Sequence, residues 1–147
     1  MTFIKKYYYQ KFSMDDIQLN TFQKNKFDKI LNEEEFEKFF SRKSLNYFIM
    51  YENKLVGFFS LNIKNNLIEL SCLYVIEECR NRSIATYVLN DIIFTVRHNL
   101  LCNVKYIVAN SFVDSSMFFL KNGFDFCKIN KKLDYRKKNI ILFYKHI

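Results

Sequence analysis

LYVIEECRNRSIA, residues 73–85, joins an apolar run to a segment with helical periodicity. Arg80, Arg82 and Ser83 lie between the two, although a simple connector would need only a turn. The first turn of a helix leaves about four backbone N–H groups without partners, and the helix dipole adds positive potential there. The stretch therefore predicts a loop that binds an anion at the start of a helix. An ordinary Ser83 N-cap with solvated arginines is the alternative.

The residues after this loop have the spacing of an amphipathic helix. Apolar side chains recur at helical intervals, with polar side chains opposite. The apolar positions are Ile84, Ala85, Val88, Leu89, Ile92, Ile93 and Val96. Strand-like runs precede and follow this helix, at 66–76 and 104–110. A strand–helix–strand order predicts that the two strands are parallel neighbours in one sheet.

The rest of the chain predicts a mostly antiparallel arrangement. An aromatic run, FIKKYYYQKF, is β-prone, and capping boxes at Ser13–Asp16 and Asn32–Glu35 predict two helices after it. Strands at 46–52 and 54–63 form a hairpin with Asn53-Lys54 as its tight link. A short helix ends at Gly123, and strands at 124–129 and 139–147 close the chain. The predicted order is β-α-α-β-β-β-α-β-α-β-β.

Composition narrows the class of protein. At 147 residues, 50% of them hydrophobic, the chain predicts a single folded domain, residues 1–147. It has no run long enough to cross a membrane and no secretory leader pattern. Four cysteines without CxxC spacing and two histidines predict a reduced cytoplasmic protein without a metal site. The formal net charge of +8 favours anionic partners without identifying one.

Two motifs carry a resemblance to a known family. The first, LYVIEECRNRSIA, matches an apolar strand followed by Arg-x-x-Gly-x-Gly/Ala, and the second, SSMFFLKNGF (115–124), matches a small residue, an aromatic pair and a final Gly-Phe. The matching residues are Leu73, Val75, Arg80, Ile84 and Ala85 in the first and Ser115, Phe118, Phe119, Gly123 and Phe124 in the second. In this order and spacing, over about residues 45–146, the chain resembles the GNAT superfamily of acyl-CoA-dependent N-acyltransferases.

The resemblance implies a fold, a reaction and a binding site. It implies an α/β (α+β) fold with a mixed, mostly antiparallel sheet of about seven strands and helices on both faces. It also implies acetyl-CoA as cosubstrate and direct transfer of an acetyl group to a primary amine. The backbone of Leu73, Tyr74 and Val75 would pair with the pantetheine arm, and the amides of Arg80, Asn81, Arg82, Ser83, Ile84 and Ala85 would hold the pyrophosphate. Asn110, Ser115 and Phe118 would complete the cosubstrate site.

The chain departs from the family pattern at two positions. Ser83 stands where the family usually has a glycine that lets the backbone approach phosphate closely. Phe119 stands where many members have a tyrosine that serves as general acid to the leaving thiolate. Phenylalanine cannot donate a proton, so either water or another group assists the thiolate, or the domain binds CoA without turnover.

Glu69 is the candidate general base. It interrupts an apolar strand, at the offset from Arg80 where histone-type members have a catalytic glutamate. A solvent-facing carboxylate is the alternative. Strict alternation puts Ser71 on the face of Glu69, where it could hold a water, and puts Cys72 and Tyr74 on the other face. Core packing is favoured for Cys72 over a nucleophilic role, since no histidine lies near it in the sequence.

The acceptor and the partners stay open. The segment KINKKLDYRKK (128–138) carries six basic residues and one acidic residue between the last two strands. It would suit an acidic acceptor, or an aminoacyl-tRNA as in the toxin branch of the family, although a solvated loop is favoured and Phe119 argues against the toxin branch. A protein, a peptide or a small amine is the expected acceptor. The chain is expected to be a monomer or a homodimer, with the last strand exposed for pairing.

Overall fold

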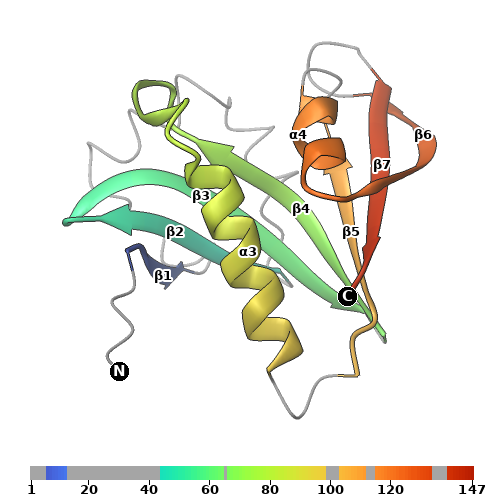
Figure 1. Cartoon of the computed structure of the whole chain (residues 1–147), viewed down its shortest axis with the longest axis horizontal. Coiled ribbons are helices and arrows are strands. Elements are labelled where there is room, and N and C mark those ends of the chain that lie inside the picture. The colour runs from blue at the N-terminus through green and yellow to red at the C-terminus, as the bar shows by residue number, and fades with distance from the viewer. Residues whose placement is uncertain (1–5, 13–43, 65, 99–102, 112–114, 134–138) are drawn as a thin grey trace.

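The computed structural model describes residues 6–12, 44–64, 66–98, 103–111, 115–133 and 139–147. These residues form one seven-stranded sheet with the strand order β1-β2-β3-β4-β5-β7-β6 (Figure 1). The strands are β1 (Tyr8–Phe12), β2 (Leu45–Tyr51), β3 (Lys54–Lys64), β4 (Leu67–Val75), β5 (Tyr106–Ser111), β6 (Asp125–Leu133) and β7 (Asn139–His146). The described helices are α3 (Ile84–Arg97), α4 (Ser116–Lys121) and the short 3-10 helix η2 (Glu77–Cys79).

The predicted topology is confirmed for these elements. β4 and β5 pair in parallel, with α3 as the crossover between them, and the other neighbouring strands pair antiparallel. The helices predicted from Ser13 and Asn32 lie outside the described residues, so helices on the second face are not described. Gly123 ends α4 as expected, with φ 82°. The Phe124 N–H donates to the Phe119 carbonyl and the Gly123 N–H to the Leu120 carbonyl, which is a Schellman ending.

Three predictions about the strands are wrong, two on their boundaries and one on their order in the sheet. The β2–β3 hairpin turns at Glu52-Asn53, with φ of 48° and 64°, and not at Asn53-Lys54. β6 continues to Leu133, so the basic segment is strand in its first half, and residues 134–138 lie outside the described residues. The last strand is not an exposed edge, because β7 lies between β5 and β6 and β6 is the outer strand. Apolar content identified these strands, but it does not reveal the order in which strands pair.

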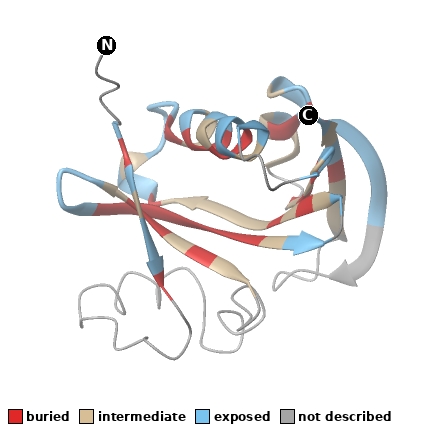
Figure 2. Ribbon diagram, turned by 90° about the horizontal axis from the view of Figure 1, so that it is seen from below, coloured by how far each residue is buried: buried red, intermediate tan, exposed pale blue. Residues whose placement is uncertain are grey.

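The larger core lies between the sheet and α3 (Figure 2). The apolar stripe of α3 is buried as predicted, at Ile84, Val88, Leu89, Ile92 and Ile93. α4 joins the same cluster through Phe119. A smaller cluster on the other face holds Phe12, Phe48, Leu55, Phe58 and Ile76, with Cys72 and Tyr74 packed against it. Among the described residues, no helix is both long enough and apolar enough to cross a membrane.

A β-bulge at Ser71 changes which residues of β4 face α3. Leu70 pairs with Leu61 and Cys72 with Ser60, so Ser71 is the extra residue on β4. Before the bulge the even-numbered Ile68 and Leu70 are buried in the α3 core, and after it the odd-numbered Leu73 and Val75 pack there. The strict alternation expected for this strand is therefore wrong. Cys72 and Tyr74 lie on the same face as Glu69, and not opposite to it.

Candidate functional site

The central feature of the site is an opening in the sheet between β4 and β5. The two strands pair from Leu67–Tyr106 to Leu70–Ala109, and no described residue continues their ladder. β4 nevertheless runs on to Val75 while paired with β3, and β5 runs on to Ser111 while paired with β7. Figure 1 shows β4 and β5 close together at one end and separated at the other. We call this opening the fork.

Backbone groups of β4 face the fork in a defined alternation. The Ile76 N–H donates to the Val56 carbonyl at 2.8 Å, and the Tyr74 carbonyl lies against Gly57, so these residues turn their backbone groups toward β3. Because backbone groups alternate along a strand, those of Leu73 and Val75 point to the open side. The fork therefore has unpaired edge groups at Leu73 and Val75, whereas the backbone groups of Tyr74, which was also predicted to pair with the pantetheine arm, are turned to β3. The Val75 carbonyl already accepts a hydrogen bond from Arg80 Nε at 3.0 Å.

The loop before α3 lies at the mouth of the fork, and two of its residues have glycine-like conformations. Asn81 has φ 64° and Ser83 has φ 60°. Ser83 is the N-cap residue of α3, but its side chain makes no capping hydrogen bond. The structure therefore does not support an ordinary serine cap at this position. Its backbone has the left-handed form that glycine adopts at the least steric cost.

Free backbone amides follow directly after Ser83. The first helical hydrogen bond runs from the Tyr87 N–H to the Ser83 carbonyl at 3.0 Å. The amides of Ile84, Ala85 and Thr86 thus precede the first helical donor, and they lie at the positive end of the α3 dipole. Ile84 is buried and Ala85 half-buried, whereas Arg80, Asn81, Arg82 and Ser83 are exposed. The arrangement can bind a phosphate group through the backbone.

Arg80 and Arg82 differ in their surroundings. The Arg80 guanidinium carbon lies 5.1 Å from the centre of the Tyr74 ring, in addition to the bond from Nε to Val75. Arg82 is exposed, and no partner for it is seen among the described residues. The sequence did not distinguish the two arginines. The aromatic residue Tyr74 was the feature that could have indicated a ring contact with one of them.

Glu69 lies in a row of polar side chains on the face of the sheet opposite α3. We call Ser44, Asn62, Ser71 and Glu69 the polar row. Ser44 Oγ donates to Asn62 Oδ1 at 2.9 Å, and Asn62 Nδ2 donates to Ser71 Oγ at 3.4 Å. Ser71 Oγ donates to Glu69 Oε1 at 3.5 Å, so the predicted association of Ser71 with Glu69 is confirmed at the long end of hydrogen bonding.

A lysine occupies the other oxygen of Glu69. Lys64 Nζ lies 3.1 Å from Glu69 Oε2, and the two side chains are 59% and 25% exposed. The carboxylate is therefore neither fully buried nor simply solvated. Its position pairs with Val108 of β5, just before the fork opens. Lys64 could not be associated with Glu69 from the sequence, because this contact depends on the reach of its side chain across the hairpin.

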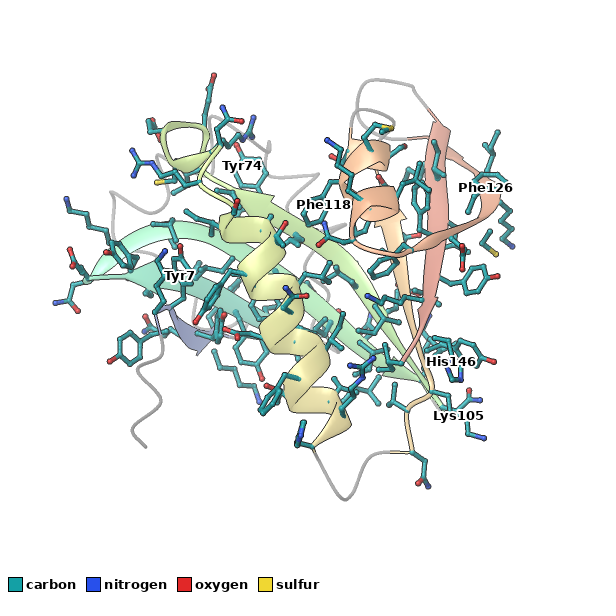
Figure 3. The ribbon with its side chains drawn as sticks, in the orientation of Figure 1. Tyr7, Tyr74, Lys105, Phe118, Phe126 and His146 are labelled. Carbon is teal, nitrogen blue, oxygen red and sulfur yellow. The ribbon has the colours of Figure 1, made fainter. Side chains whose placement is uncertain are left out.

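The far side of the fork holds the remaining predicted site residues. Asn110 is half-buried and lies one position past the last β4–β5 pair, on the face of Val108 and Glu69. Ser115 is the half-buried N-cap residue of α4 and makes no side-chain capping bond. Phe118 packs against the larger core and contacts the Phe119 ring at 5.1 Å. In Figure 3, Phe118 lies on the side of α4 toward β4.

Two side chains of α4, Phe119 and Ser116, bear on how this helix could contact a cosubstrate. Phe119 is only 5% exposed and stacks on Phe143 at 5.7 Å, so its ring belongs to the core. Ser116, which sequence reasoning missed, has a buried Oγ without a hydrogen-bond partner among the described residues. A buried hydroxyl without a hydrogen-bond partner lowers the stability by about 1–3 kcal/mol. A ligand that supplies the missing partner would recover this free energy. Ser116 lies one helical turn before Phe119.

The structure favours a packing role for Cys72 over a nucleophilic one. Its thiol packs in the smaller aromatic cluster, and burial raises its pKa. A thiol that stays protonated is a poor nucleophile. In the described part of the chain no three His, Cys, Asp or Glu side chains gather into a group that could hold a metal ion.

Comparison with known proteins points to one family. The acetyltransferase (GNAT) domain family matches residues 5–139. No curated protein matches the sequence.

Solved structures resemble the whole chain. An IAA acetyltransferase from Bacillus cereus has a TM-score of 0.73 at 12% identity, over 96% of this chain and 99% of that one. A GNAT family acetyltransferase from Elizabethkingia anophelis, with acetyl-CoA bound, has a TM-score of 0.72 at 15% identity, over 98% and 100%. A Bacillus subtilis acetyltransferase in complex with CoA has a TM-score of 0.71 at 11% identity, over 97% and 99%. At these identities the likeness concerns the fold.

Proposed function

The chain belongs to the acetyltransferase (GNAT) domain family, and we propose that it transfers an acetyl group from acetyl-CoA directly to a primary amine. The feature that carries the proposal is the fork with the start of α3 at its mouth. The free edge of β4 suits an extended arm with amide groups, and the free amides of α3 suit a diphosphate. Coenzyme A carries these two groups in series, and two solved structures of the same fold contain acetyl-CoA or CoA.

The proposed transfer forms one bond and breaks one bond. The neutral amine attacks the thioester carbonyl, a C–N bond forms, the C–S bond breaks, and CoA leaves as the thiolate. The amine proton passes to Glu69, directly or through a water held by Ser71, and solvent protonates the thiolate. The polar row supports this role because it orients Glu69 beside the start of the fork. The ion pair between Lys64 and Glu69 would have to break before the acceptor amine could reach this carboxylate oxygen.

The surroundings of Phe119 favour a second candidate function, which is CoA binding without turnover. The ring is buried and packed among Phe118, Phe124 and Phe143, and no proton donor is seen beside it in the part of the chain that the structure describes. The Ser116 hydroxyl, which has no partner among the described residues, is a candidate on α4 for a hydrogen bond to the cosubstrate. If no such group protonates the leaving thiolate, the domain would bind CoA without transferring the acetyl group.

The acceptor is proposed only as a class. A protein, a peptide or a small molecule with a primary amine fits the reaction, and the protein is expected to be cytoplasmic and a monomer or homodimer. Acetylation of aminoacyl-tRNA is the less favoured alternative, since it rests on the basic segment alone. Like charge also opposes polyamines, because the chain carries a net charge of +8.

The test combines binding with turnover. Purified protein is mixed with acetyl-CoA alone and with pools of amines, and release of the CoA thiol is followed together with the mass of the products. Acetyl-CoA should raise the melting temperature, since a ligand at 100-fold excess over Kd adds about 2.7 kcal/mol. Amine-dependent thiol release supports the enzyme, and stabilisation without release supports the binding domain.

A variant of the loop tests the cosubstrate assignment. Arg80→Glu places a carboxylate next to the proposed diphosphate and should remove most of the stabilisation by acetyl-CoA. Glu52→Lys, in the β2–β3 turn, is the control for an exposed change of charge elsewhere. An unchanged shift in Arg80→Glu would mean that this loop does not bind the cosubstrate.

A further inference from the structure

Three side chains form a stack at the end of β4. The Arg80 guanidinium carbon lies 5.1 Å from the centre of the Tyr74 ring. The Tyr74 ring stacks on Phe58 with centroids 5.2 Å apart and an interplanar angle of 17°. Phe58 is 2% exposed and is the cross-strand partner of Tyr74. A buried ring therefore supports a half-buried ring, which in turn supports an exposed charge.

A second contact fixes the direction of the guanidinium. Arg80 Nε donates to the Val75 carbonyl at 3.0 Å, on the edge of β4 that faces the fork. The ring contact holds the guanidinium beside Tyr74, and the hydrogen bond restrains its Nε edge. In the described part of the chain no acceptor is seen for the two terminal nitrogens, whose planar N–H groups match the oxygens of a phosphate.

The close approach of β3 and β4 keeps this stack in place. A Cβ atom at Gly57 would lie 2.1 Å from the Tyr74 carbonyl oxygen, so only glycine lets the two backbones come this near. Gly57 pairs with Val75, and Phe58 pairs with Tyr74. The backbone position of Tyr74 is thus set by the neighbouring strand before any ligand arrives.

We propose that Tyr74 is a positioning residue that holds the Arg80 guanidinium toward the diphosphate of the cosubstrate at the mouth of the fork. This inference rests on the proposed binding of acetyl-CoA. Its physical basis is preorganisation, because a long arginine side chain that is already ordered loses less conformational freedom on binding. The aromatic ring contributes through its electron-rich face, which attracts the cation.

The test compares two variants of Tyr74 against two ligands. Tyr74→Leu removes the ring, and Tyr74→Phe keeps it as the matched control. Calorimetry measures Kd for coenzyme A and for pantetheine, which has the arm but lacks the diphosphate. We expect Tyr74→Leu to weaken coenzyme A binding about two- to five-fold, the range that an exposed cation–π contact supplies. Pantetheine binding should change by less, and Tyr74→Phe should bind both ligands like the wild type.

A double variant isolates the role of Arg80. In an Arg80→Gln background, Tyr74→Leu should have no further effect on Kd for coenzyme A, because the group that it positions is gone. Equal weakening for both ligands would overturn the proposal, since Tyr74 would then shape only the strand. Tighter coenzyme A binding in Tyr74→Leu would overturn it as well, because the ring would be holding Arg80 away from the ligand.

The failure of this inference differs from the failure of the proposed function. Normal coenzyme A binding without amine-dependent turnover would reject the enzyme and leave the comparison of Tyr74 variants valid. Turnover with Kd values that Tyr74→Leu leaves unchanged would reject the positioning role alone. A wild-type protein that does not bind coenzyme A would reject both.

Discussion

Glu69 is the residue on which the proposed chemistry depends most directly. Glu69→Gln keeps the shape and the hydrogen bond to Ser71 but removes the proton acceptor. Turnover should fall within the range of about 10²–10⁴-fold that general bases supply, while stabilisation by acetyl-CoA stays nearly unchanged. Steady-state kinetics and thermal melts of the same preparations check the two parts.

Glu52→Gln makes the same chemical change in the exposed β2–β3 turn and serves as the control. Lys64→Met should separate the roles further, because it releases Glu69 from its ion pair and leaves the carboxylate in place. A Glu69→Gln enzyme with wild-type kcat at neutral and mildly alkaline pH would make Glu69 a structural residue.

Phe119 decides whether the missing tyrosine limits the rate. Phe119→Tyr adds a hydroxyl to a residue that is only 5% exposed. The centroid of its ring lies 5.3 Å from that of Phe124 and 5.7 Å from that of Phe143. A buried hydroxyl without a partner costs about 1–3 kcal/mol, so we expect a lower melting temperature and at most a small gain in kcat. Phe126→Tyr, at a position of β6 that is 56% exposed, is the control and should change neither the melting temperature nor kcat.

A large rise in kcat for Phe119→Tyr would contradict this expectation. It would mean that the hydroxyl reaches the leaving thiolate in spite of the packed ring. The wild-type chain would then be an enzyme that has lost its acid rather than one that uses another group.

At the scale of single elements, Gly57 controls how β3 and β4 fit together. Gly57→Ala places a methyl group 2.1 Å from the Tyr74 carbonyl oxygen, so one strand must shift. Overpacking of this kind costs about 1–3 kcal/mol. Because Tyr74 lies on the displaced strand end and Arg80 contacts it, affinity for acetyl-CoA should fall together with stability.

Ile63→Ala, at a position of β3 that is 58% exposed, is the control for Gly57→Ala and should change stability by less than about 0.5 kcal/mol. Denaturant unfolding gives the stability and calorimetry gives the affinity. A stable Gly57→Ala protein would show that the strands tolerate a wider spacing than the structure has.

Periodicity predicted whole elements well, and it failed where a single residue breaks the pattern. The stripe from Ile84 to Val96 predicted α3, because burial along a helix follows its 3.6-residue repeat. Alternation misassigned Cys72 and Tyr74, because the bulge at Ser71 is a matter of how β3 and β4 pair and leaves no mark in the apolar pattern. The Arg80–Tyr74 and Lys64–Glu69 contacts depend on side-chain rotamers, which a sequence pattern does not contain.

At the scale of the whole molecule, two half-buried acids make stability depend on pH in the alkaline range. Burial raises the pKa of the Cys72 thiol above its ordinary 9.0. Burial and the hydrogen bond to Asp91 raise the pKa of the Tyr9 hydroxyl above its ordinary 10.0. Both groups keep their protons in the folded state when the unfolded chain releases them. These two groups therefore leave the free energy of unfolding unchanged below about pH 9, and they lower it as pH rises above that value.

Two variants separate these contributions in denaturant titrations at increasing pH. Cys72→Ala should remove the part of the decline that begins near the ordinary thiol pKa of 9.0, which amounts to at most about 1.4 kcal/mol per pH unit. Tyr9→Phe should remove the part that begins near 10.0, although it also loses the bond that ties β1 to α3. A wild-type stability that is flat up to strongly alkaline pH would contradict both assignments.

Because of the fork, this sheet has an unpaired strand edge at its centre, where most sheets have one only at their outer strands. Leu73 and Val75 present strand-edge groups inside the molecule, where a ligand with amide groups completes the ladder as an extra strand would. Exposed strand edges are also the places where chains pair with one another. The empty protein is thus expected to be more prone to aggregation than the liganded one, and short extended peptides should compete with the pantetheine arm for the same edge.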